Sequence, residues 1–192
     1  MKLKLKWVLL SLVTVCSQIS YSAESIDKFI NSHQEEYQQL ALKIWELAEV
    51  GYQEHKSSAL LQESLSSKGF KVETLPYMPT GFIAEYGEGS PVIAILGEFD
   101  ALPGVSQSSS PFKEKYKNNA AGHACGHHLF GAGSAWSAVT VKEWLSKNNR
   151  SGTIRFYGTP AEEGGSGKVY MVRDGLFDDV DVVLHWHPGS VN

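Results

Sequence analysis

Residues 92–100 read VIAILGEFD, five apolar residues in a row followed by a turn that carries two carboxylates. A continuous apolar run bounded by polar residues is typical of a strand that is buried on both faces of a sheet. Residues 153–157 (TIRFY) and 180–184 (VDVVL) also read as strands. We therefore predict three buried strands, each of which leads into a polar cluster.

Segments with the apolar spacing of helices alternate with these strands. The predicted helices cover residues 25–50, 54–68, 127–148 and 166–174. Two shorter strands, at 70–75 and 81–86, are predicted around a turn at 76–79, and the Ser-, Gly- and Asn-rich residues 103–121 predict a loop. The alternation of strands and helices predicts an α/β fold in which a mostly parallel central sheet is flanked by helices.

The first 23 residues have the pattern of a secretory signal peptide. Three lysines among the first six residues precede an apolar core at 8–15, and small residues then suit cleavage near Ser22 or Ala23. The core is too short to span a bilayer, although a retained anchor or a structured helix is the alternative. We expect a secreted or periplasmic protein without membrane attachment after cleavage, whose folded part is residues 24–192.

Composition excludes several classes of protein. The 192 residues are 42% hydrophobic and 20% charged, which is typical of one globular domain rather than a disordered chain. Asp and Glu number 21 against 17 Lys and Arg, so there is no electrostatic case for a nucleic-acid partner. Because Cys16 would leave with the signal peptide, Cys125 is left as a buried small residue, a reactive thiol or a metal ligand.

Polar residues collect where the predicted strands end. Residues 97–100, 159–165 and 185–188 each follow one of the three strands. A fourth cluster, GHACGHH at 122–128, precedes the helix between two of them. Ligands in open α/β folds bind outside the carboxyl ends of the strands, so we expect these clusters to meet in space.

Cysteine, histidine and glutamate together form a ligand set for zinc-like ions. Glu162 and Glu163 are adjacent carboxylates, which suits a division of labour in which one binds metal and the other acts as general base. A less specific interpretation is that these glutamates only begin a helix. Cys125 and His127 are also spaced to form a nucleophile pair, which would ignore the carboxylates.

The remaining candidates also have structural interpretations. Asp100 would serve only to cap a turn, and His185 and His187 would be hydrogen-bonded core histidines at the end of a strand. Their alternation places the two histidines on one face, so that one or both would reach a site.

Four segments in order resemble the aminoacylase/carboxypeptidase-type metallopeptidases, in the branch of amidohydrolases that act on N-acyl and aminobenzoyl amino acids. They are GEFDALPGVSQ (97–107), AAGHACGHHLFGAG (120–133), GTPAEEGGSGKVYM (158–171) and DVDVVLHWHPG (179–189). AEVGYQEHKSS (48–58) is also similar to an early helix-turn-helix of that family, so the resemblance runs from about residue 25 to the end. It implies a zinc-peptidase-like catalytic domain.

The resemblance also implies roles for individual residues. The metal ligands, for one or two Zn²⁺ or Mn²⁺ ions, would be Cys125, His127, Glu163 and His187. Glu162 would be the general base, and Asp100 would orient a ligand histidine. His128 stands where relatives carry Asp or Asn, and His185 is not a family ligand position, so both are additional candidates.

The resemblance implies hydrolysis of an amide bond in a small N-acyl amino acid by metal-activated water. Family members are longer and often dimeric, with a lid domain and a further histidine ligand, so residues 24–192 are expected to be the N-terminal portion of such a catalytic domain. A sheet edge and apolar surface would then be exposed. The alternatives are a truncated, non-catalytic metal-binding fragment and a cysteine hydrolase.

Overall fold

The computed structural model describes residues 25–189. The predicted signal peptide therefore lies outside the described residues. Residues 25–32 are helical, and a turn at His33 separates them from helix α2 (Gln34–Leu47). The prediction of one helix over 25–50 is wrong at this point. The backbone N–H of His33 bonds to the carbonyl of Ile30, and the Ser32 hydroxyl bonds to the carbonyl of Phe29, so local bonds replace the regular helical ladder.

The later elements follow the predicted order. Helix α3 (His55–Ser67) precedes strands β1 (Lys71–Leu75), β2 (Met78–Glu88) and β3 (Val92–Gly97). Helix α4 (His127–Lys147) then leads to β4 (Gly152–Gly158), the short helices α5 (Glu162–Gly165) and α6 (Gly167–Arg173), and β5 (Val182–Leu184). No helix among residues 25–189 is both long and apolar enough to cross a membrane.

The five strands form one mixed sheet in the order β1-β2-β4-β3-β5. Strand β3 pairs in parallel with β4 and β5, whereas β2 pairs antiparallel with both β1 and β4. The prediction of a mostly parallel sheet is therefore wrong. Strands β1 and β2 are joined by a turn of only two residues, and a connection that short permits only an antiparallel hairpin.

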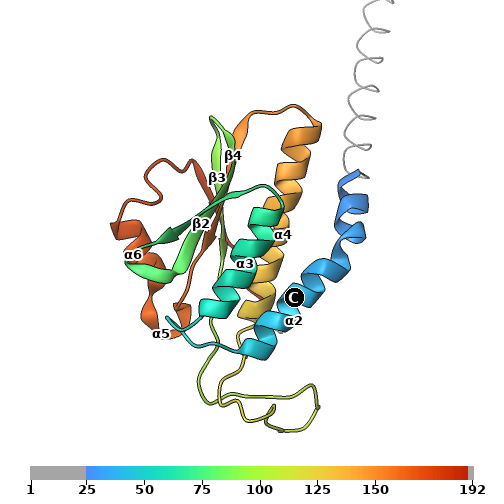
Figure 1. The fold of residues 1–192 in the computed structure, drawn as a ribbon, viewed down its shortest axis with the longest axis vertical. Helices are drawn as coiled ribbons and strands as arrows, with labels where there is room; N and C mark the ends of the chain where they lie inside the picture. The colour runs from blue at the N-terminus through green and yellow to red at the C-terminus, as the bar shows by residue number, and fades with distance from the viewer. Residues whose placement is uncertain (1–24, 190–192) are drawn as a thin grey trace, which may run out of the picture. The chain divides into compact units, whose positions relative to one another are not determined.

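Helices cover the two faces of the sheet (Figure 1). Helix α4 contacts β3 and β4 on one face, and α3 contacts β2 and α4 beside it. On the other face Met171 of α6 joins a buried cluster with Leu96 of β3 and Tyr157 of β4. Because side chains alternate along a strand, successive residues of the VIAIL segment face opposite sides of the sheet and therefore different helices.

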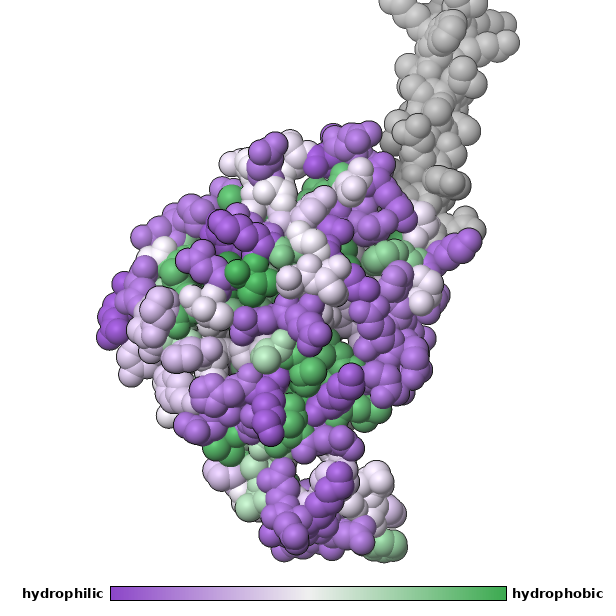
Figure 2. All heavy atoms as spheres, in the orientation of Figure 1, coloured by the Kyte–Doolittle hydropathy of each residue, from purple (hydrophilic) through white to green (hydrophobic). Residues whose placement is uncertain are grey.

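Strand β5 is not buried, contrary to the prediction for residues 180–184. It lies at an edge of the sheet, and Val182, Val183 and Leu184 are 45–51% exposed. Apolar side chains are thus exposed at this edge of the sheet. On the face drawn in Figure 2 hydrophilic residues predominate, and hydrophobic residues gather between them in the middle and lower part of the described structure.

Candidate metal centre

Asp100 joins two of the predicted polar clusters. It follows β3, is 1% exposed, and accepts a hydrogen bond at Oδ1 from Nδ1 of His127 at 2.8 Å. Its other oxygen, Oδ2, accepts the backbone N–H of Glu163 at 2.9 Å. When the imidazole is neutral and its Nδ1 donates to this carboxylate, Nε2 is the nitrogen left with a free lone pair. The hydrogen bond to Asp100 therefore fixes the imidazole of His127 in an orientation in which Nε2 can bind a metal.

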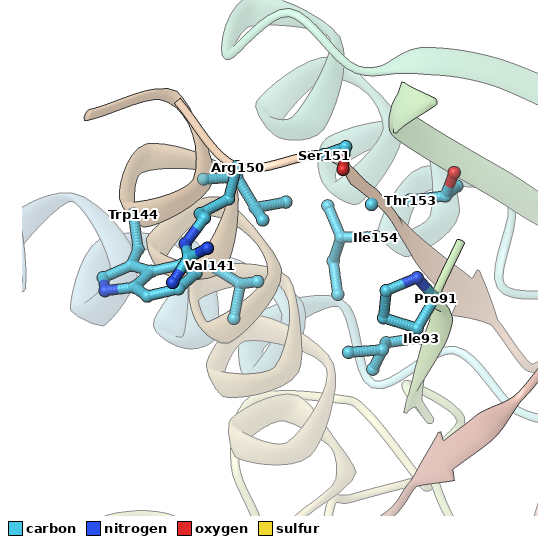
Figure 3. A pocket seen from close by; sticks show the side chains of 10 residues that line it. Pro91, Ile93, Val141, Trp144, Arg150, Ser151, Thr153 and Ile154 are labelled. Atoms are coloured by element: carbon cyan, nitrogen blue, oxygen red, sulfur yellow. The ribbon is translucent and has the colours of Figure 1, made fainter. Parts of the chain in front are cut away.

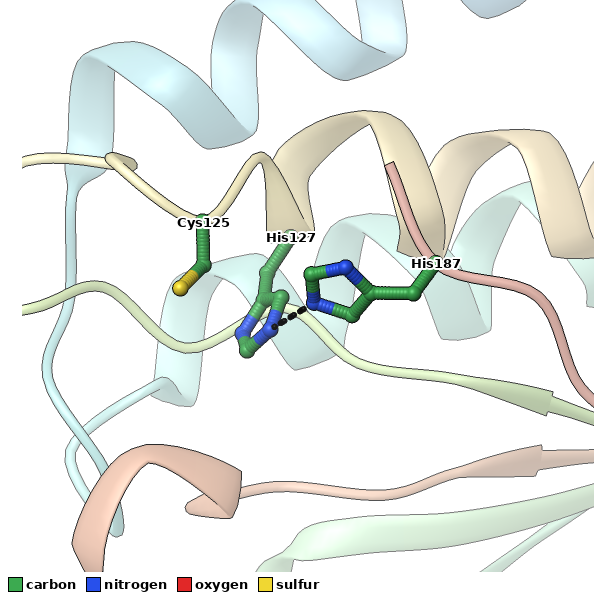
Figure 4. Close-up of side chains that lie close together, drawn as sticks. All are labelled: Cys125, His127 and His187. Atoms are coloured by element: carbon green, nitrogen blue, oxygen red, sulfur yellow. Dashed lines mark hydrogen bonds between the residues drawn. The ribbon is translucent and has the colours of Figure 1, made fainter. Parts of the chain in front are cut away.

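Three predicted ligands, Cys125, His127 and His187, lie close together, and in Figure 4 the imidazole of His127 lies between the other two side chains. The ligand atoms of Cys125, His127 and His187 all lie within 4.8 Å of one another, and the Nε2 atoms of the two histidines are 3.2 Å apart. Gly126 makes this possible, because its φ of +77° turns the chain sharply between Cys125 and the start of α4. A Cβ on Gly126 would also lie 3.0 Å from Pro188.

The adjacent Glu162 and Glu163 approach Nε2 of His127 from the segment that follows β4. Oε2 of Glu162 and Oε1 of Glu163 each lie 3.9 Å from Nε2 of His127. The glutamates begin α5 directly after Ala161, which has a left-handed φ of +56°. The fully buried carboxylate of Glu54 stabilises that turn, because its Oε1 accepts the N–H of Ala161 at 2.8 Å.

Glu98 also belongs to this cluster, although sequence reasoning gave it no role. It is 2% exposed, its Oε2 lies 2.9 Å from Nε2 of His127, and its Oε1 pairs with the ammonium of Lys168. Glu98, His127 and Glu162 form a second group whose ligand atoms lie within 4.8 Å of one another. The available signal was spacing, because residues 98 and 100 of an extended segment point to the same side.

The predicted additional histidines lie at the margins. His128 turns toward His123, with ring centroids 5.1 Å apart, and burial lowers the pKa of both imidazoles to about 4. His185 lies 3.4 Å from Oε1 of Glu98 and packs edge-on against Phe130. Neither His128 nor His185 belongs to the two groups of mutually close ligand atoms found among the described residues.

The electrostatics of the cluster favour a cation. Burial lowers the pKa of His127, but the carboxylates of Asp100 and Glu98 outweigh it and raise the pKa to about 10. Hydrogen bonding to Glu163, together with burial, raises the pKa of Cys125 to about 11. An activated cysteine nucleophile has a lowered pKa, so the surroundings argue against the cysteine-hydrolase alternative.

The residues present fit a divalent metal ion. Two nitrogen atoms bound to the same tetrahedral zinc ion at 2.0–2.1 Å are about 3.3 Å apart. This is close to the 3.2 Å between Nε2 of His127 and Nε2 of His187. Oε2 of Glu98 and Oε1 of Glu163 are buried without a hydrogen-bond partner. Buried carboxylate oxygens of this kind are costly unless a cation or a donor faces them.

Comparison with known proteins shows to which family the chain belongs. The profile described as peptidase family M20/M25/M40 matches residues 94–192, which is half of the chain. The chain belongs to this family. Its members are amide hydrolases and peptidases, so this M20 chain belongs to a family of hydrolases.

Individual relatives agree with this assignment. One of the subunits of p-aminobenzoyl-glutamate hydrolase from Escherichia coli (strain K12) is 46% identical over 167 residues, covering 85% of this chain and 34% of that protein. Hippurate hydrolase of Campylobacter jejuni is 31% identical over 157 residues, covering 80% and 39%. The M20 chain thus spans between about a third and two fifths of these curated relatives.

A solved relative has the same fold and a metal centre. A Bacillus subtilis protein described as a dinuclear metal binding peptidase from the M20 family matches with a TM-score of 0.68 and 28% identity. The match covers 81% of this chain and 44% of that one. The mixed sheet and flanking helices of the present chain are therefore those of M20 peptidases over part of their length.

Three hollows of about 310–320 Å³ are found in the described surface, and one of them, lined by residues of β1, β2 and β4 such as Arg155, contains no predicted site residue. A second, of about 310 Å³, borders the metal cluster and is lined by Asp100, Glu163 and small or apolar residues that include Tyr52 and Ala161. The third, of about 320 Å³, lies at the opposite ends of β3 and β4, between Pro91 and Trp144 (Figure 3). It contains none of the predicted site residues, so we place the candidate site at the hollow that borders the metal cluster.

Proposed function

We propose that this chain carries the metal-binding part of an amidohydrolase that cleaves the amide bond of small N-acyl or p-aminobenzoyl amino acids. The supporting observation is that the ligand atoms of Cys125, His127 and His187 lie within 4.8 Å of one another, and the carboxylates of Glu162 and Glu163 each lie 3.9 Å from Nε2 of His127. We propose that Cys125, His127, Glu163 and His187 hold one or two divalent ions, Zn²⁺ or Mn²⁺.

The chain's own residues then divide the remaining work. A divalent ion held here would polarise the scissile carbonyl and lower the pKa of a water molecule to about 7. We assign to Glu162 the role of accepting the proton of that water and passing it to the leaving amine. Its side chain is 44% exposed and therefore open to water, whereas the side chain of Glu163 is only 16% exposed.

The names of two relatives support the substrate class. One is a hydrolase of p-aminobenzoyl-glutamate and the other of hippurate, and both compounds are aromatic acyl amides of amino acids. The hollow of about 310 Å³ beside Glu163 is mainly apolar and has the size of a small-ligand pocket. Export, with cleavage near Ser22 or Ala23, is part of the proposal, and the mass of the mature chain from a periplasmic fraction tests it.

The decisive experiment measures metal content and hydrolysis of p-aminobenzoyl-glutamate and simple N-acyl amino acids by the purified chain, with and without a chelator. Chelator-sensitive hydrolysis supports the proposal. Bound metal without hydrolysis would instead support a non-catalytic metal-binding chain, and a folded protein without metal would contradict the ligand assignment.

Glu162→Gln separates the base from the ligands. We expect this variant to keep its metal and to lose turnover, because the amide cannot accept the proton of water. Turnover equal to that of the unchanged chain would remove Glu162 from the role of general base.

A further inference from the structure

The two oxygens of Glu98 have different surroundings. Oε1 pairs with Nζ of Lys168, and Nε2 of His185 lies 3.4 Å away. Oε2 makes no hydrogen bond among the described residues, but it lies 2.9 Å from Nε2 of His127, with which it forms an ion pair when the imidazole is protonated, and the side chain is only 2% exposed. The carboxylate is therefore anchored by one oxygen, while the other is buried and directed at His127.

Lys168, the partner of Oε1, lies at the start of helix α6. Lys168 is the second residue of α6, and the first, Gly167, lies so close to the carbonyl of Pro160 that a Cβ there would be 2.2 Å from its oxygen. Helix α6 therefore begins in close contact with the segment that leads to Glu162. Lys168 of this helix pairs with Oε1 of Glu98, and Oε2 lies beside Nε2 of His127.

The second oxygen of Glu98 lies among the atoms of other candidate ligands. Oε2 of Glu98 lies 2.9 Å from Nε2 of His127, and both residues offer an atom within 4.8 Å of a carboxylate oxygen of Glu162. At this separation both atoms can face the same cation.

We propose that Glu98 is a further metal ligand of this chain, next to His127. The inference rests on the proposed function, because it adds a ligand to the same site. A carboxylate supplies a hard oxygen beside the thiolate and the imidazoles, and such a set suits Zn²⁺ or Mn²⁺ with more than four ligands.

The test compares Glu98→Gln with Glu85→Gln in the full chain, using Zn²⁺ and Co²⁺ as the probes. Glu85 carries the control because its carboxylate also pairs with a cation, Arg155, on β4. Zn²⁺ affinity is measured by competition with a chromophoric chelator. The visible absorption of bound Co²⁺ reports the number and type of ligands, and its near-ultraviolet thiolate band reports Cys125.

We expect Glu98→Gln to weaken Zn²⁺ binding about tenfold or more and to change the visible Co²⁺ bands while the thiolate band persists. Glu85→Gln keeps the affinity and both sets of bands. Unchanged affinity and visible bands in Glu98→Gln would overturn the proposal while leaving the proposed function intact. Absence of metal from the unchanged chain would overturn both.

A second variant guards against misfolding. If circular dichroism shows that Glu98→Gln does not fold, Glu98→Asp keeps the negative charge opposite Lys168 but withdraws the oxygen by one carbon–carbon bond, about 1.5 Å. The same weakening and spectral change are expected. Affinity and Co²⁺ spectrum equal to those of the unchanged chain would reject Glu98 as a ligand.

Discussion

Replacing Asp100 by asparagine tests whether one buried carboxylate organises the whole site. Asp100 accepts two hydrogen bonds, one from Nδ1 of His127 at 2.8 Å and one from the backbone N–H of Glu163 at 2.9 Å. Asparagine has the same shape but only one acceptor oxygen, so its NH₂ group must face one of these donors. One buried donor is then left unpaired, or His127 changes tautomer and presents a proton where it would bind metal.

The expected magnitude follows from those two bonds. A buried donor without a partner costs about 1–3 kcal/mol, which should appear as a lower free energy of unfolding of the metal-free chain in urea. Loss of the residue that orients a ligand histidine weakens metal binding by about 10–100-fold. Zn²⁺ affinity, measured by chelator competition at fixed pH, is therefore the second readout.

Asp179→Asn provides the matched control. Asp179 also accepts two hydrogen bonds, from Arg155 at 2.7 and 3.0 Å, but its side chain is 63% exposed. Pairs of this exposed kind contribute about 0–1 kcal/mol, and no effect on Zn²⁺ affinity is expected. Equal losses of stability in the two variants, or unchanged Zn²⁺ affinity in Asp100→Asn, would refute the argument that Asp100 organises the site.

Three further changes test separate features of the structure. Cys125→Ser should weaken Zn²⁺ binding and abolish the thiolate band of bound Co²⁺, because a soft ligand is lost; equal metal content in both proteins would count against it. Burial raises the pKa of Glu54 from 4.5 to about 7, so the proton it binds stabilises the fold at low pH and this contribution disappears as the pH rises through that range. Glu54→Gln should therefore gain stability relative to the unchanged chain between pH 4.5 and 7, by up to about 3 kcal/mol in urea unfolding, and a pH-independent difference would contradict this. Gly131→Ala should cost about 1–3 kcal/mol, because its Cβ would lie 2.7 Å from the carbonyl oxygen of Glu98. Gly164→Ala, where a Cβ meets nothing within 4 Å, should stay within about 0.5 kcal/mol, and similar melting curves for the two would show that α4 is not so tightly packed.

Much of the candidate site was predictable because its residue types are informative. Cys125, His127 and His187 are uncommon residues in dense clusters, and the structure brings their ligand atoms within 4.8 Å. The adjacent Glu162 and Glu163 lie 3.9 Å from His127, at the carboxyl end of the sheet where the strand pattern predicted them. Their chemical roles stay predictions.

Glu98 was not predictable in the same way. A glutamate after a strand is usually solvated, and nothing in its neighbours along the chain indicates that it is 2% exposed. Its burial depends on Lys168, which follows 70 residues later, and on the first turn of α4. Contacts between segments that distant leave no local pattern.

The positions of β3, α3 and α4 could be read from the chain because burial and helical periodicity are local properties of a sequence. Strand direction and strand exposure could not. The apolar run at residues 180–184 looked buried, yet β5 lies at the sheet edge, and β2 runs antiparallel to β4. These features depend on which strands pair and on what covers them, and the free energy of those contacts arises only when segments far apart in the chain are packed together.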